Sequence, residues 1–225
     1  MSRLCTAKRS PTVYAYPPGY RRAGTTPDRT CVGRCVRIEK GMRERFTALS
    51  IPVEEAFFLQ PFRERHILTP AAKKPPHVTV YSPFKELDLA TGQVIQDLME
   101  MFASFEQFTY TLKGIGRFSD IGVLYLTVSP SEPFQVLSQS IQRKYPEIEP
   151  FISDPILHVT LARVKDMDTV EKEFYQVYGD RLPIQAIAKE VCLYEKLNST
   201  WYKRESFALA AASSPIHRTD VPIRG

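Results

Sequence analysis

A four-residue motif occurs twice in this chain of 225 residues, as His77-Val78-Thr79-Val80 and as His158-Val159-Thr160-Leu161. Because side chains alternate between the two faces of a strand, each copy predicts a strand with histidine and threonine on one face and aliphatic residues on the other. A hydrophobic core accounts for the aliphatic pair. It does not account for an imidazole and a hydroxyl two residues apart, twice, in a chain with four histidines.

Strand and helix patterns alternate along residues 42–211, and the two halves look alike. We expect strands over residues 45–51, 77–81, 108–115, 123–128, 156–161, 184–194 and 201–209. Apolar residues at helical spacing predict helices over 53–65, 88–105, 132–144 and 168–178, the last beginning with Asp168 and Glu171 as an Asp-led capping box. Each half places a motif strand ahead of a helix and a strand pair. The pattern predicts an α+β fold of two pseudo-symmetric lobes.

The basic charge is concentrated at the N-terminus. Residues 1–41 contain nine Lys or Arg and two Asp or Glu, so the rest of the chain holds 21 and 23, a net charge of −2 against +5 overall. We expect residues 1–41 to be a disordered, Pro- and Gly-containing basic extension, upstream of a true start at Met42. A nucleic-acid or partner tail and an organelle transit segment are the alternatives. Residues 42–211 are the expected domain and 212–225 a C-terminal tail.

No metal, cofactor or membrane partner is expected. Cys31 and Cys35 could form half a zinc site, but no second pair or histidine lies nearby to complete tetrahedral ligation. Cys192, in an apolar strand, is expected in the core. The sequence has no apolar run of about 18 residues and no apolar leader. We therefore expect a monomeric cytoplasmic protein with free thiols.

The chemistry of the two motifs is that of paired acid–base catalysis. Two imidazoles facing one pocket can act as general base and general acid, since histidine titrates near neutral pH. Two threonine hydroxyls can donate hydrogen bonds to the non-bridging oxygens of a phosphate. His77 and His158 are thus the candidate catalytic residues, and Thr79 and Thr160 the candidate phosphate ligands. Metal-free phosphodiester cleavage fits this set best; a zinc site is the rival, without a third ligand at a characteristic spacing.

The paired motifs resemble those of the two-histidine (2H) phosphoesterases, in particular the branch of 2′-5′ RNA ligase-like proteins and RNA 2′,3′-cyclic phosphodiesterases. Further similarities are HVTLAR at 158–163, GIGRF at 114–118 with VLYL at 123–126, MRERFTALSIP at 42–52, and Trp201-Tyr202. The resemblance implies antiparallel sheets lining a central cleft, with His77 and His158 as acid and base and Thr79 and Thr160 on the phosphate. Which histidine is the base stays open.

The activity implied by the resemblance is the opening of a 2′,3′-cyclic phosphate at an RNA or nucleotide end, giving a 2′-phosphate, as a step of RNA processing. The same site could instead serve a 2′-5′ RNA ligase or a 2′-5′ phosphodiesterase. A catalytically silent RNA-binding member is a further alternative, which the intact histidines and threonines argue against.

Several weaker candidates surround the motifs. Tyr81, Trp201 and Tyr202 are candidate substrate contacts, with plain packing as the alternative. Lys73 and Lys74 precede the first motif and are expected to be a solvated pair in a loop. Arg163 alternates away from the face of His158 and Thr160 unless the strand bends.

Overall fold

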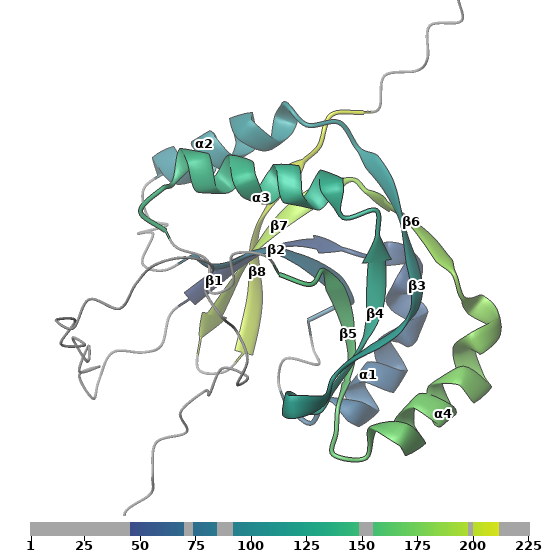
Figure 1. Cartoon of the computed structure of the whole chain (residues 1–225). Coiled ribbons are helices and arrows are strands. Elements are labelled where there is room, and N and C mark those ends of the chain that lie inside the picture. Colours follow the sequence, from purple (N-terminus) through teal and green to yellow (C-terminus); the bar gives the residue numbers. More distant parts are fainter. Residues whose placement is uncertain (1–45, 70–73, 85–91, 149–154, 198–199, 212–225) are drawn as a thin grey trace, which may run out of the picture. The chain divides into compact units, whose positions relative to one another are not determined.

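The computed structural model describes residues 46–69, 74–84, 92–148, 155–197 and 200–211, all within the unit Gly41–Gly225. In these residues eight strands form two antiparallel four-stranded sheets, with α-helices packed on them (Figure 1). The strands are β1 (Phe46–Pro52), β2 (His77–Phe84), β3 (Phe108–Phe118), β4 (Val123–Ser129), β5 (His158–Arg163), β6 (Ile184–Ala188), β7 (Glu190–Leu197) and β8 (Thr200–Ala208). The helices are α1 (Gln60–His66), α2 (Gly92–Ala103), α3 (Glu132–Lys144) and α4 (Met167–Tyr178), with 3-10 turns η1 (Glu54–Leu59), η3 (Ser119–Ile121) and η4 (Gly179–Arg181). The extensions predicted at 1–41 and 212–225 lie outside the described residues.

The two sheets repeat one arrangement. Their strand orders are β2-β1-β7-β8 and β5-β4-β3-β6, so each motif strand is an edge strand. Each also lies beside the strand that precedes it by one helix, in the units β1–α1–β2 and β4–α3–β5. This repeat confirms the pseudo-symmetric α+β fold predicted from the sequence.

Two of the helices, α1 and α3, pack across the two halves. α1 follows β1 of the first sheet but packs against β5 of the second, and α3 follows β4 of the second sheet but packs against β2 of the first. α4 lies next to α1, and the ring of its Phe174 meets that of Phe62 in α1 edge-to-face at 5.3 Å. As a result β2 and β5, the two motif strands, lie side by side.

The aliphatic residues of both motifs belong to one hydrophobic core. Val78, Val80, Val159 and Leu161 are buried there, as the alternation predicts. The helices add the buried side chains of Phe62, Leu98, Phe102, Phe134, Leu137, Ile141, Val170 and Phe174. Burial of this apolar surface, at about 25 cal/mol per Å², holds the motif strands against the helices.

The prediction of one strand over residues 184–194 is wrong, because two strands form there. β6 ends at Ala188 and pairs with β3, whereas β7 begins at Glu190 and pairs with β1 in the other sheet. The chain therefore changes sheets at Lys189, whose exposed ammonium is paired with Glu54 at 2.8 Å. Apolar residues precede and follow the Lys189-Glu190 pair, so the sequence pattern is interpreted as one strand.

Two helix starts also differ from the prediction. Pro61 has no N–H to donate to Phe57, so the helix predicted over 53–65 begins as the 3-10 turn η1 and becomes α-helical only at Gln60. The predicted capping box of α4 is wrong as well. Asp166 is the cap, accepting from the Thr169 N–H at 3.1 Å.

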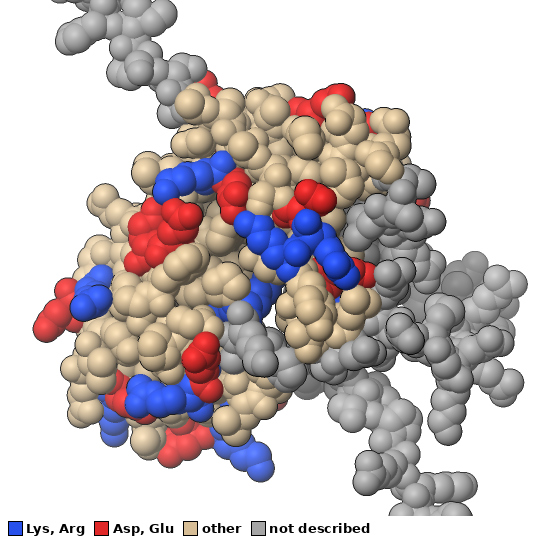
Figure 2. Space-filling view, turned by 180° about the vertical axis from the view of Figure 1, so that it is seen from behind, with Lys and Arg blue, Asp and Glu red and all other residues tan. Residues whose placement is uncertain are grey.

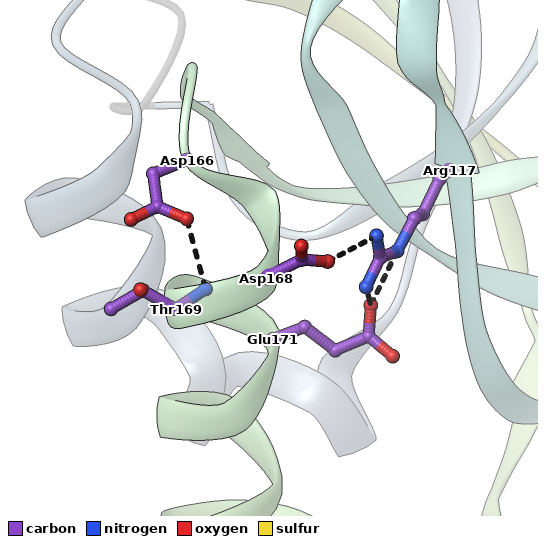
Figure 3. A network of polar contacts seen from close by, with 5 residues as sticks. All are labelled: Arg117, Asp166, Asp168, Thr169 and Glu171. Carbon is purple, nitrogen blue, oxygen red and sulfur yellow. Dashed lines mark hydrogen bonds and ion pairs between the residues drawn. The ribbon is translucent and has the colours of Figure 1, made fainter.

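Asp168 and Glu171, the predicted capping pair, do not cap α4. Both carboxylates bind the guanidinium of Arg117 on β3, each at 2.6 Å, as Figure 3 shows. This network ties α4 to the hairpin of β3 and β4, whose connection turns at Gly122 with a φ of 62°. A left-handed residue of this kind favours glycine.

Charged side chains on the described surface are mixed in sign. On the face shown in Figure 2, Lys and Arg alternate with Asp and Glu over the described residues. This agrees with the net charge of −2 for residues outside 1–41. No helix in the described ranges is both long and apolar enough to cross a membrane.

Candidate active site

The two motif histidines are held in the same way. Nδ1 of His77 lies 2.6 Å from the carbonyl oxygen of Pro75, and Nδ1 of His158 lies 2.6 Å from the carbonyl oxygen of Ile156. Each carbonyl belongs to the residue two positions earlier. Because a carbonyl can only accept, both Nδ1 atoms carry the proton. In the neutral imidazoles Nε2 is then the unprotonated nitrogen, available as a base or, once protonated, as an acid.

The motif threonines lie on the same faces as their histidines, and the cross-strand pairs show this. Thr79 is opposite Ser50 on β1, and Thr160 is opposite Tyr125 on β4. Within the described residues, neither threonine hydroxyl takes part in a hydrogen bond. Both hydroxyls are therefore free to donate to a ligand.

A β-bulge follows each threonine. Ser50 pairs with Thr79 but Leu49 pairs with Tyr81, and likewise Tyr125 pairs with Thr160 but Leu124 pairs with Ala162. Each motif strand thus contains one extra residue at the aliphatic position after threonine. A bulge of this kind shifts the alternation of side chains by one residue.

Because of the bulges, two residues lie on the strand face opposite to the one that simple alternation predicts. Tyr81 pairs with the core residue Leu49, is 2% exposed, and donates its hydroxyl to the Ile148 carbonyl at 2.5 Å. This position favours its packing role. Arg163 lies on the face of Thr160, whereas simple alternation predicts the other face. Together with burial, its charge lowers the pKa of His158. The bend needed to bring Arg163 toward the motif is therefore present.

Lys74 is buried beside the first motif, so its assignment to a solvated pair is wrong. It is 4% exposed, and its ammonium donates to the Ser50 hydroxyl at 2.9 Å. The ammonium also lies over the rings of Tyr194, at 4.1 Å, and Trp201, at 4.8 Å. Lys73 lies outside the described residues. No local pattern indicates that Lys74 is enclosed, because the enclosing rings come from β7 and β8.

Of the two candidate aromatic residues on β8, the structure brings only Trp201 to this cluster. The ring of Tyr194, which Lys74 also contacts, lies 6.3 Å from the ring of His77. Tyr202 alternates to the opposite side of β8, is 47% exposed, and lies under the guanidinium of Arg204 at 5.7 Å. Trp201 is therefore near the first motif, and Tyr202 is not.

A pair of aromatic rings adjoins the second motif, and the sequence analysis missed both. Tyr125 stacks on Phe118 with centroids 4.3 Å apart, and the His158 ring lies 5.1 Å from Tyr125 and 5.2 Å from Phe118. Gly116, opposite Tyr125, makes room for this stack, because a Cβ there would lie 2.3 Å from the Tyr125 ring. A hollow of about 280 Å³ begins next to His158, lined by Thr127, Val128, Ser131, Gln135, Pro155, Ile156 and Leu157.

Positively charged side chains surround the two motif histidines and affect their pKa values. Burial, together with the charges of Lys74, Arg63 and His158, lowers the pKa of His77 well below its usual 6.5. Burial and Arg163 lower the pKa of His158. Burial likewise lowers the pKa of Lys74 and brings that of Arg63 to about 10. An anion bound here would raise both imidazole pKa values, since an opposite charge favours the charged form.

Arg63, in the middle of α1, is a second buried cation that the sequence analysis missed. It is 2% exposed, and neither Arg63 nor Lys74 forms an ion pair with a carboxylate in the described part of the chain. Two buried cations, two imidazoles and two free hydroxyls thus gather where β2 and β5 meet. They form a set of groups suited to an anionic substrate such as a phosphate. Among the described residues, no group of three His, Cys, Asp or Glu is arranged to hold a metal ion.

Several solved structures share this fold. A crystallised phosphoesterase matches 74% of this chain and 99% of its own length, with 17% identity and a TM-score of 0.54. E. coli LigT, crystallised with ATP, matches 74% of this chain and 98% of its own length, with 17% identity and a TM-score of 0.52. The protein TT0787 of Thermus thermophilus matches 75% and 100%, with 14% identity and a TM-score of 0.51.

Sequence comparison gives the family. A protein of Bacillus pumilus (strain SAFR-032), named for an inferred phosphoesterase activity, is 28% identical over 142 residues, 60% of this chain and 80% of its own. The model of the 2′-5′ RNA ligase superfamily matches residues 51–200, a span that includes both motifs. The chain therefore belongs to the 2′-5′ RNA ligase superfamily of 2H phosphoesterases.

Proposed function

We propose that the protein is a metal-independent phosphodiesterase that opens a 2′,3′-cyclic phosphate at an RNA or nucleotide end. The observation that carries this proposal is the repeated geometry of His77 and His158, each with its proton fixed on Nδ1 and with a threonine hydroxyl two residues on. Family membership supports phosphoester chemistry. LigT, a protein of the same fold, has been crystallised with ATP and with NADP+, which supports a ligand of nucleotide type.

In the proposed reaction one neutral imidazole takes a proton from water through Nε2 while the water oxygen bonds to phosphorus. The bond between phosphorus and the ribose 3′ oxygen breaks, and the other imidazole, as imidazolium, donates its Nε2 proton to that oxygen. Thr79 and Thr160 donate hydrogen bonds to the non-bridging oxygens, whose charge grows in the transition state. The product is a 2′-phosphate with a free 3′ hydroxyl.

Ring opening by a different nucleophile would use the same groups. If a 5′ hydroxyl replaces water as the nucleophile, the same proton transfers join two ends through a 2′-5′ linkage. The superfamily name supports this second candidate. The remaining alternative is a protein that binds RNA without catalysing turnover, and the experiment must exclude it.

The test is a substrate panel with the purified full-length protein in EDTA. It includes RNA with a 2′,3′-cyclic end, 2′,3′-cyclic nucleotides and 2′-5′ oligoadenylate, with and without an acceptor carrying a 5′ hydroxyl. We expect turnover of a cyclic phosphate to a 2′-phosphate, identified by chromatography against authentic isomers. Binding without turnover of every substrate would contradict the proposal, and so would a 3′-phosphate product.

A further inference from the structure

Arg63 connects the two motif-bearing segments through its side chain. Its Nε donates to the carbonyl oxygen of Thr160 at 2.9 Å, and its Nη1 donates to the carbonyl oxygen of Lys74 at 2.8 Å. Nη1 also donates to the side chain of Gln60, one turn earlier on α1, at 2.6 Å. One buried guanidinium thus binds backbone from both halves of the molecule.

One bonded carbonyl belongs to the motif residue Thr160, and the other belongs to Lys74, three residues before His77. Thr160 is itself a motif residue, and Lys74 precedes Pro75, whose carbonyl holds Nδ1 of His77. A shift of either segment would therefore move a histidine or a threonine. Because β2 and β5 belong to different sheets, no backbone ladder among the described residues fixes one motif relative to the other. A side chain that bonds to both segments can do this.

The burial of Arg63 costs free energy that its hydrogen bonds must offset. Arg63 is 2% exposed and has no carboxylate partner among the described residues, and burial brings its pKa to about 10. Removing the guanidinium would leave the carbonyls of Thr160 and Lys74 without this donor, and an unpaired buried acceptor is costly. Only arginine offers a rigid planar fork that can donate to two carbonyls in fixed directions.

We propose that Arg63 is the positioning residue that sets the spacing of the His77–Thr79 and His158–Thr160 pairs, without touching the reacting atoms. This inference rests on the proposed function for its kinetic consequence, because spacing matters only when both motifs act on one phosphate. A misplacement of about 1 Å can cost about 100-fold in rate.

The test compares Arg63→Met and Arg63→Lys with the matched control Arg65→Met in the full-length protein. Arg65 lies two residues along α1, with its side chain 58% exposed and paired with Glu173 at 2.9 Å. We expect both Arg63 variants to lose about 100-fold in kcat with KM nearly unchanged. Arg63→Met should melt below the wild-type temperature, because two carbonyls lose their donor. A merely structural arginine would leave kcat unchanged in the fraction that stays folded at the assay temperature. The control should retain wild-type kcat.

A second readout separates this inference from the proposed function. In nitrogen-edited NMR spectra of the imidazoles, both motif histidines of the wild type should show the Nδ1–H tautomer. The imidazole nitrogen signals of both histidines should change in Arg63→Met, and those of neither histidine should change in Arg65→Met. If the wild type turns over no substrate, the proposed function fails and this spectrum still decides the role of Arg63. Unchanged imidazole signals would overturn the inference, and so would wild-type kcat or a loss confined to KM.

Discussion

His77 and His158 are oriented by the same contact, an Nδ1–H donated at 2.6 Å to the carbonyl of the residue two positions earlier. The two rings are nevertheless unequal in their surroundings. His77 is influenced by the buried cations Lys74 and Arg63, whereas His158 lies beside the exposed Arg163 and two aromatic rings. The equal contact fixes the tautomer, and the unequal surroundings separate the two titrations.

The pH dependence of the reaction follows from these surroundings. Acid–base catalysis by the pair requires one neutral and one protonated imidazole, so kcat/KM should follow a bell between the two pKa values of the free protein. Because both values are lowered, we expect the optimum of kcat/KM below pH 6.5. The profile for kcat should lie at higher pH, since the bound phosphate raises both values. Initial rates across the pH range would contradict this if the kcat/KM optimum lay above about pH 7.

The threonine hydroxyls should matter for rate and not for stability. Thr79→Val and Thr160→Val remove hydroxyls that have no hydrogen-bond partner in the described residues, so the melting temperature should hardly change. We expect each to lower kcat by about 100- to 1,000-fold through loss of a donor to the transition state. Thr→Ser at the same positions keeps the donor and should retain most of the activity. Equal activity of the Val and Ser variants would contradict the phosphate-binding role.

Gly116 is expected to be required for the shape of the second half of the site. In Gly116→Ala the new Cβ would meet the Tyr125 ring at 2.3 Å and displace it from Phe118 and His158. We expect a loss of about 1–3 kcal/mol in stability and a lower kcat. Gly114→Ala is the matched control, because no atom lies within 4 Å of a Cβ there. Urea unfolding and steady-state kinetics on both variants measure the difference, and similar behaviour of the two would contradict the argument.

Sequence patterns predict the parts of this molecule that local chemistry determines. The helix over Glu132–Lys144 appears with the predicted bounds, and both motif strands form. The crossing at Lys189 is not predicted, because a change of sheet is a tertiary event and the Lys189-Glu190 pair between apolar residues is also compatible with one strand. Asp166 and Asp168 are equally good cap residues in sequence, and only the position of Arg117 assigns one of them to β3.

The same division holds for the candidate site. The repeated motif identifies His77 and His158, and their aliphatic neighbours predict which face is buried. It does not identify Lys74 or Arg63, because charged residues beside prolines or on a short helix are usually solvated. Their burial depends on rings and carbonyls supplied by other strands. The bulge that places Arg163 on the face of Thr160 cannot be predicted from the sequence either, because it depends on cross-strand register.

Lys74 should affect stability as well as the titration of His77. Its pKa in the folded protein is lowered, so the unfolded chain binds more protons between that value and about 10.5, and the free energy of unfolding rises with pH across this window. Lys74→Met should be at least as stable as wild type near neutral pH and lack this rise. Urea unfolding at about pH 7 and about pH 9.5 measures the slope.

The control for this slope is Lys189→Met. Lys189 is half exposed and paired with Glu54, and its pKa is raised, so removing it should leave the rise of the wild type in place. The kinetic consequence is separate, because Lys74→Met should move the limb that His77 contributes to the kcat/KM bell toward higher pH. Parallel unfolding slopes in wild type and Lys74→Met would contradict the lowered pKa of Lys74 in the folded protein.

The central claim is that both motif histidines act together, without metal, on one phosphate. The most direct test is the rate of opening of a 2′,3′-cyclic phosphate in EDTA by His77→Ala, His158→Ala and the control His66→Ala, a histidine at the end of α1 paired with Glu173. We predict that each motif variant folds and loses activity by about 100-fold or more, while His66→Ala remains active. Substantial activity in either motif variant, or activity of the wild type that appears only on addition of zinc, would contradict the account.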